Sequence, residues 1–300
     1  MLMGPAPLSP YHRLVRPSWW RMVLGALFIV VAGAVLGFAG YAAGTAAVPG
    51  ARGEMAGGFL TVAGFLPATV LAAWWIQRRR PGTLSSVTGR LRWRWLLACL
   101  PVAAGTVTLL MAAAMLLPGE TTAQDRLAGW GPFALSMLVL LVVVPPQAAA
   151  EEYLMRGWLL QGLGGWFRGP WVPIVVQAVA FAALHGWGTP WGFADLVVFG
   201  LVAGLLTVRT GGLEAAIALH VANNLLGSVI VAAYGDLGTD ETAADMPWQA
   251  VAVDVPLLIA YAVVVLWLAR RRGLSVTSPG APIVPAGYSP PPAGRPVHTG

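Results

Sequence analysis

Polar and ionisable side chains gather in three short motifs inside otherwise apolar parts of this sequence. The motifs are EEYLMR at 151–156, FAALH at 181–185 and HVANN at 220–224. An ionisable group inside a lipid bilayer costs several kcal/mol, so groups of this kind are functional candidates, above all when partners lie nearby. The three motifs therefore contain the main candidates for functional residues.

The residue types in these motifs suit hydrolysis of an amide bond by water. Glu151 can accept a proton from water, and His185 can hold and polarise that water. His220 and Asn224 can donate hydrogen bonds to the oxygen that becomes negative in the tetrahedral intermediate. No Ser or Cys lies beside a His in a nucleophile-like setting, which argues against a covalent acyl-enzyme.

Helical spacing separates the two adjacent glutamates of the first motif. Glu152 and Arg156 are four residues apart, so they share a helix face and can form an ion pair that supports the helix. Glu151 is rotated by about 100° from Glu152 and points elsewhere. Other interpretations stay open: two His on different helices can ligate haem, and a Glu with two His can bind zinc, although no HExxH motif is present.

Other charged residues have simpler interpretations. Asp195 and Asp254 lie near the outer ends of apolar segments, where a carboxylate can reach the membrane surface. Glu214 opens an apolar segment and is expected to complement the helix dipole. Residues 83–95 mix Arg with Leu and Trp, which is typical of a stretch lying at the membrane interface.

The composition excludes most classes of protein. The 300 residues are 57% hydrophobic and only 10% charged, which is far below the roughly 25% of soluble domains. The formal charge of +6 does not indicate nucleic-acid binding, because the basic residues are all Arg and lie beside apolar segments. The chain is predicted to be an all-α, polytopic membrane protein whose partners include the lipid bilayer and no nucleic acid.

Eight membrane spans are predicted from the apolar segments. They cover approximately 22–43, 57–76, 95–117, 131–163, 170–185, 192–208, 212–233 and 249–269. With both termini in the cytoplasm, only Arg52 and Arg126 fall on the outer side, as the positive-inside rule requires. The fourth span is expected to bend at Pro145-Pro146 but to cross the membrane once.

Three regions follow from this topology. Residues 1–21 form a cytoplasmic segment, 22–272 form the transmembrane domain with the motifs in a core at 145–230, and 273–300 form a disordered, Pro-rich cytoplasmic tail.

The three motifs in this order resemble those of the CPBP family of intramembrane endopeptidases (CAAX protease and bacteriocin-processing proteins), which include the type II CAAX prenyl endopeptidases. That family has EExxxR, FxxxH and HxxxN in an eight-helix bundle, and this sequence has Glu151-Glu152-x-x-x-Arg156, Phe181-x-x-x-His185 and His220-x-x-x-Asn224. The matched core is about 145–230.

The resemblance implies a glutamate-dependent protease. It implies Glu151 and His185 as the water-activating pair, His220 and Asn224 as the oxyanion site, and Glu152 and Arg156 as structural support, with no cofactor and no metal. A metalloprotease is the alternative catalytic type. A non-catalytic scaffold or bacteriocin-immunity protein of the same fold is the alternative function.

The implied substrate is a membrane protein or a lipidated peptide, and prenylation is not implied by the motifs. The Arg-only, Ala- and Gly-rich composition suggests a bacterial inner membrane as the location.

Overall fold

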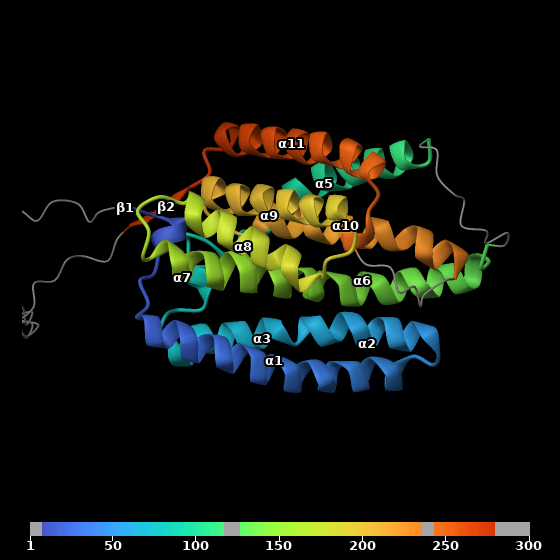
Figure 1. Ribbon diagram of the computed structural model, residues 1–300, viewed down its shortest axis with the longest axis horizontal. Helices are drawn as coiled ribbons and strands as arrows, with labels where there is room; N and C mark the ends of the chain where they lie inside the picture. Colours follow the sequence, from blue (N-terminus) through green and yellow to red (C-terminus); the bar gives the residue numbers. More distant parts are fainter. Residues whose placement is uncertain (1–7, 117–126, 236–242, 280–300) are drawn as a thin grey trace, which may run out of the picture.

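The computed structural model describes residues 8–116, 127–235 and 243–279, and these form an elongated bundle of helices (Figure 1). The main helices are α1 (Trp19–Ala47), α2 (Ala51–Ala63), α3 (Phe65–Leu71), α5 (Trp93–Ala114), α6 (Trp130–Glu152), α8 (Trp171–Leu184), α9 (Pro190–Thr210), α10 (Glu214–Tyr234) and α11 (Trp248–Arg271). Shorter elements are the single turns η1 (Tyr11–Arg13) and η4 (Ala243–Asp245), the π-helical segments η2 (Ala72–Ile76) and η3 (Tyr153–Leu159), and α4 (Gly82–Ser85) and α7 (Leu160–Gly164).

The helices stack in layers across the bundle. Helices α1, α2 and α3 form one side, α6 packs on α2, and α10 packs on α6; α5 and α11 close the opposite side (Figure 1). Helix α8 packs on α9 and on the π-helical segment η3. The three motif-bearing segments therefore occupy the middle of the bundle, between the two outer layers.

The protein is an all-α, multi-pass membrane protein, as predicted. Seven helical segments in the described residues are long and apolar enough to cross a membrane. The predicted fifth span corresponds to α8, which has only 14 residues. At about 1.5 Å per residue it reaches about 21 Å, which is short of a bilayer core of roughly 30 Å. Helix α8 accordingly ends part-way along the bundle (Figure 1).

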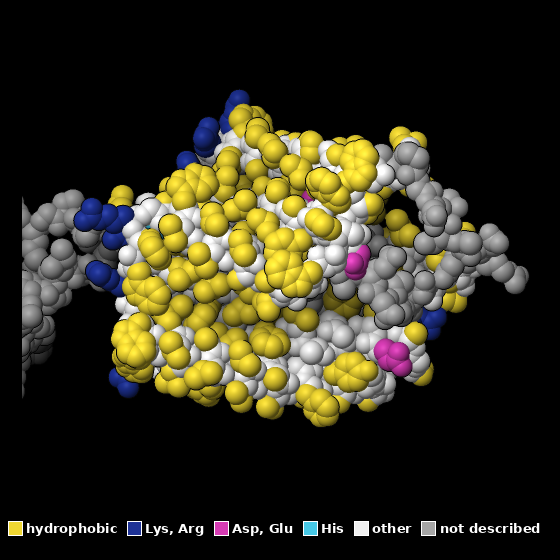
Figure 2. All heavy atoms as spheres, in the orientation of Figure 1, with side chains coloured by type: hydrophobic (Ala, Val, Ile, Leu, Met, Phe, Trp, Pro, Cys, Tyr) yellow, Lys and Arg dark blue, Asp and Glu magenta, His cyan; other side chains and the backbone are white. Residues whose placement is uncertain are grey.

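Apolar side chains cover the surface that faces lipid. Phe38 on α1, Val142 on α6 and Val263 on α11 are more than half exposed, which would be costly in water. Figure 2 shows apolar atoms over the middle of one face, with arginine side chains gathered mainly at one end. Charge at the ends and an apolar belt between them are typical of a bundle that crosses a bilayer.

The two ends of the described chain meet at that arginine-rich end. Strand β1 (Leu8–Pro10) pairs antiparallel with β2 (Thr277–Pro279), with Ser9 opposite Ser278. Residues 8–10 and 277–279 therefore lie on the same side of the bundle, and the assignment of that side to the cytoplasm stays a prediction. The first residues of the predicted tail contribute to β2, and 280–300 lie outside the described residues.

The predicted fourth span is one continuous helical segment, 35 residues long. Pro145 and Pro146 lie inside α6 without ending it. The irregularity comes directly after Glu152, where the seven residues of η3 adopt a π-helix. Such widened turns are rare and occur often at functional sites.

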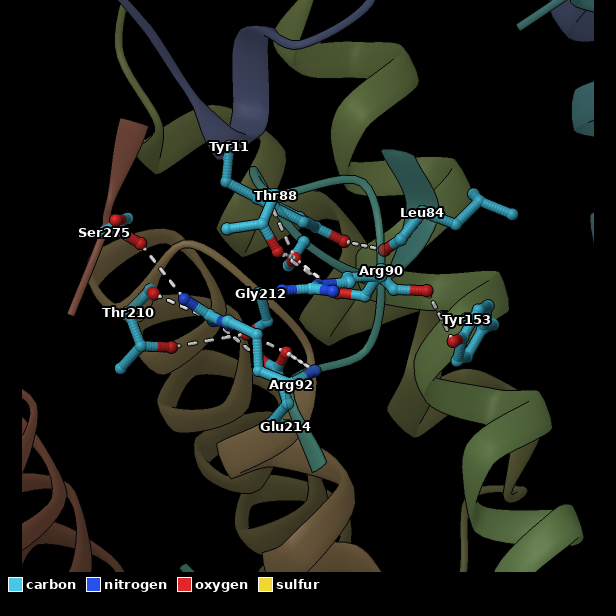
Figure 3. A network of polar contacts seen from close by, with 12 residues as sticks. Tyr11, Leu84, Thr88, Arg90, Arg92, Tyr153, Thr210, Gly212, Glu214 and Ser275 are labelled. Carbon is cyan, nitrogen blue, oxygen red and sulfur yellow. Dashed lines mark hydrogen bonds and ion pairs between the residues drawn. The ribbon is translucent and has the colours of Figure 1, made fainter. Parts of the chain in front are cut away.

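Part of the segment expected at the membrane interface is instead packed into the bundle, whereas Arg90, Trp93 and Arg94 are exposed. Leu84 and Val87 are buried, and Trp95 is 3% exposed. The Arg92 guanidinium reaches inward to Glu214 at the start of α10 (Figure 3). The interfacial interpretation of 83–95 is wrong for the residues that are packed inward, because a carboxylate on another helix gives Arg92 a buried partner.

Candidate active site

The structure brings the three motifs together. Glu151 lies on α6, His185 caps the end of α8 and His220 lies in the first half of α10. Both His Nε2 atoms face the same carboxylate oxygen: Glu151 Oε2 is 3.8 Å from His185 Nε2 and 3.7 Å from His220 Nε2. These separations are too long for direct hydrogen bonds, and a polar contact of this length suits an intervening water.

Glu151 Oε2 is buried and has no hydrogen-bond partner in the described residues. A buried carboxylate oxygen without a partner is costly in a folded protein, so its position calls for an explanation. Its neighbour Oε1 accepts a hydrogen bond from Gln147, at 2.5 Å. One oxygen of this carboxylate is thus fixed and the other is left for a ligand or water.

His220 lies between the two adjacent glutamates. Its Nδ1 is 2.7 Å from Glu152 Oε1, while its Nε2 faces Glu151. The helix rotation that separates Glu151 from Glu152 therefore places them on opposite sides of one imidazole ring. The contact of the Glu152 carboxylate with Nδ1 fixes the orientation of the His220 ring and keeps Nε2 directed toward Glu151.

Glu152 and Arg156 form the predicted ion pair, 2.9 Å apart and fully buried. The Arg156 guanidinium also lies over the Phe181 ring, 4.6 Å from its centroid. Because Glu152 Oε1 contacts Arg156 and His220 at once, the pair does more than join two turns of one helix. It positions the ring of His220.

His185 has a defined tautomer when its ring is neutral. Its Nδ1 lies 2.9 Å from the Phe181 carbonyl oxygen, and a carbonyl can only accept. Nδ1 therefore carries the proton, and Nε2 keeps a lone pair directed at the space beside Glu151. A water between Glu151 and His185 can donate one hydrogen to each.

Gln147 is a site residue that the sequence reasoning missed. It donates to Glu151 and accepts a hydrogen bond from Asn224 Nδ2 at 2.9 Å. It thereby joins Asn224 to the Glu151 carboxylate and leaves the second Asn224 N–H free. The spacing of four residues between Gln147 and Glu151 was the available signal.

Two hollows border this site. The front pocket, of about 420 Å³, is lined mainly by apolar side chains, and Glu151 and His185 lie on its wall. The back cavity, of about 50 Å³, is lined by His185, His220 and Asn224 together with Asp195 and Asp254. His185 and Phe181 border both hollows and form the partition between them.

Asp195 and Asp254 do not reach the membrane surface as expected. They are 5% and 6% exposed, on α9 and α11 respectively. Both are held inside because α9 and α11 pack directly against each other. The prediction of surface carboxylates is wrong for both residues.

No group of three His, Cys, Asp or Glu side chains in the described residues is arranged to hold a metal ion.

Comparison with known proteins agrees with the motifs. Residues 130–226 match the family model of the Rce1-like type II CAAX prenyl endopeptidases. Over this core segment, the chain is similar to that family, in agreement with the resemblance of its motifs to the CPBP proteins. The matched residues include all three motifs, and the family is one of proteases.

A curated relative covers more of the chain. The uncharacterized protein YyaK of Bacillus subtilis (strain 168) is 25% identical over 225 residues, which is 69% of this chain and 72% of the relative. No solved structure matches the chain.

Proposed function

We propose that the protein is an intramembrane endopeptidase that hydrolyses a peptide bond with water activated by Glu151 and His185. The observation that carries the proposal is the unpartnered Glu151 Oε2, buried between the Nε2 atoms of two histidines at 3.8 and 3.7 Å. A water placed there is oriented by two acceptors. Glu151 takes one of its protons as the oxygen attacks the carbonyl carbon.

The tetrahedral intermediate carries a negative oxygen that needs donors. The free N–H of Asn224 is one donor. His220 Nε2–H is the other when the ring carries both protons, because Nδ1–H then donates to Glu152. Glu151 finally returns its proton to the leaving amine, so that water is consumed and no net proton is released. Glu152 and Arg156 act as support for the His220 ring.

The front pocket suits a membrane-associated substrate. Its wall is formed by apolar residues such as Phe65, Leu154 and Leu184, and Glu151 opens onto it. An apolar segment of a membrane protein or a lipidated peptide fits this lining, since burial of apolar surface is favourable. We place the protein in a bacterial cell membrane, with the arginine-rich end in the cytoplasm.

The test is a mass-spectrometric survey of peptide termini in membranes from cells that carry wild type or Glu151→Gln. Glu54→Gln is the matched control, because it makes the same change at an exposed glutamate on α2. We expect termini that are present with wild type and Glu54→Gln and absent with Glu151→Gln.

Identical termini in all three samples, at equal protein abundance, would overturn the protease proposal and favour a non-catalytic scaffold or immunity protein. A chelator added to purified wild type tests the catalytic type. Cleavage lost with chelator and restored by metal would replace the glutamate-dependent scheme with a metalloprotease.

A further inference from the structure

Asp195 and Asp254 come from different helices, yet both are buried and line the same small cavity. Neither forms an ion pair in the part of the chain that the structure describes. Two carboxylate oxygens can hydrogen-bond only when a proton lies between them. Since two unpaired charges side by side inside a membrane bundle would be costly, we expect at least one of the two groups to carry a proton.

The back cavity lies against this acid pair. Asp195 Oδ1 is buried and has no hydrogen-bond partner in the described residues, so it is available to a molecule in the cavity. A volume of about 50 Å³ holds a few water molecules and excludes a peptide side chain of ordinary size. The same cavity is also lined by His185 and His220, whose Nε2 atoms face Glu151.

Main-chain contacts close the cavity on the side of η4. Thr189 donates from its backbone N–H to the Ala244 carbonyl at 2.8 Å and from its hydroxyl to the Met246 carbonyl at 2.7 Å. A Cβ at Gly192 would lie 2.1 Å from the Ala244 carbonyl oxygen, so only glycine permits this approach. These contacts hold η4 against the start of α9, so that Ala243 and Met246 form one wall of the cavity.

We propose that Asp195 and Asp254 bind the water that the catalytic residues consume, and that the back cavity is the store from which it reaches Glu151 past His185 and His220. The inference rests on the proposed hydrolysis. An apolar substrate in the front pocket displaces water from that side, whereas the reaction needs one water for each bond cleaved. A polar cavity on the far side of His185 supplies that water without competing with the substrate.

In this scheme Asp195 and Asp254 are positioning residues that act through water. Asp195→Leu removes the water-binding group and fills part of the cavity, while Asp195→Asn keeps the size and the hydrogen-bonding capacity. We expect Asp195→Leu to lower kcat by about tenfold or more with KM within about twofold, and Asp195→Asn to retain most of kcat. A general packing defect would not be rescued by Asn in this way.

Infrared spectroscopy of the purified protein tests the acid pair without any substrate. The wild type should show a carboxylic-acid C=O band that shifts within minutes of transfer to D₂O and that is lost in the Asp195→Leu/Asp254→Leu double variant. Glu54→Gln should leave the band unchanged. Absence of the band from the wild type, or a band that does not respond to D₂O, would overturn the water-linked acid pair.

The kinetic result separates this inference from the proposed function. Wild-type kcat in a folded Asp195→Leu variant would overturn the water store while leaving the protease intact. No cleavage by wild type would overturn the proposed function, and the infrared band would still decide whether the acid pair binds exchangeable water.

Discussion

Two buried Arg–Glu pairs hold the bundle together, and they differ in how completely their polar atoms are used. At the arginine-rich end, Arg92 donates from Nε and Nη2 to the two oxygens of Glu214, at 2.9 and 2.6 Å. Its remaining donors reach the carbonyls of Thr210 and Ser275, both at 3.0 Å (Figure 3). This pair joins the 84–92 segment, the turn before α10 and the chain that leads to β2.

The Glu152–Arg156 pair in the middle of the bundle has far fewer of its polar atoms in hydrogen bonds. Arg156 makes one hydrogen bond to Glu152, and its Nε and Nη2 have no hydrogen-bond partner in the described residues. Glu152 Oε2 is equally without one. In place of further hydrogen bonds, this pair has the ring of His220 and the face of Phe181.

The difference indicates two roles. A fully hydrogen-bonded pair offsets the cost of its burial and stabilises the fold, whereas a partly satisfied pair is retained at a cost that a second role can explain. We infer that Arg92–Glu214 is structural and that Glu152–Arg156 is coupled to the site through His220.

The largest expected effect is on activity, at Glu152. Glu152→Gln removes the charge that faces His220 Nδ1, so the ring loses its fixed proton arrangement. Cleavage should fall on the order of 10²- to 10⁴-fold, the range found when the orienting or proton-transferring partner of a catalytic group is lost. The measurement is the initial cleavage rate of the purified variant, with its thermal unfolding midpoint as the control for folding. A folded Glu152→Gln variant that cleaves at the wild-type rate would contradict the proposed coupling between the ion pair and the site.

The next largest effect is a loss of stability when either Arg–Glu pair is broken, and the activity of the variants then distinguishes the two pairs. Glu214→Ala and Arg156→Ala each leave one buried charge without its partner, which costs about 3–5 kcal/mol and lowers folded yield. Cleavage per folded molecule should stay near wild type in Glu214→Ala and collapse in Arg156→Ala. Equal folded yields for Arg156→Ala and wild type would contradict its supporting role, and a Glu214→Ala variant that folds normally but is inactive would contradict the division.

The smallest expected effect is the loss of stability when Arg92 or Arg156 is replaced with lysine. Lys keeps the charge but loses the planar fork of donors. Arg92→Lys should cost about 1–3 kcal/mol because several hydrogen bonds are lost together, and Arg156→Lys should cost less because one is made. Chemical denaturation in detergent measures both free energies of unfolding. A larger loss of unfolding free energy in Arg156→Lys than in Arg92→Lys would contradict the assignment of Arg92–Glu214 as the more stabilising pair.

Much of the fold could be predicted from sequence because each helix that crosses a membrane must be apolar over its own length. The all-α, polytopic class is confirmed on that basis. The number of membrane-spanning helices was harder to predict. Helix α8 is apolar enough to resemble a span but too short to cross, and it ends beside the site at His185. Apolar composition alone does not distinguish a full crossing from a short helix that ends part-way along the bundle.

The site was predictable where one helix decides it. Spacing of four residues fixed the Glu152–Arg156 pair and could have revealed Gln147 beside Glu151, because the helix backbone alone sets which side chains are neighbours. The order of the three motifs also predicted the family, which the match at 130–226 confirms. The catalytic roles of these residues stay predictions.

What the sequence determined by itself was therefore local: apolar segments, residues that share a helix face, and the types of side chain that enter the bundle. Only the tertiary structure placed His220 between Glu151 and Glu152, drew Arg92 inward to Glu214 and brought Asp195 and Asp254 to the same cavity. The physical reason is that these contacts cross between helices. Their distances depend on how whole helix faces pack, and the packing of helix faces is not contained in the periodicity of any one segment.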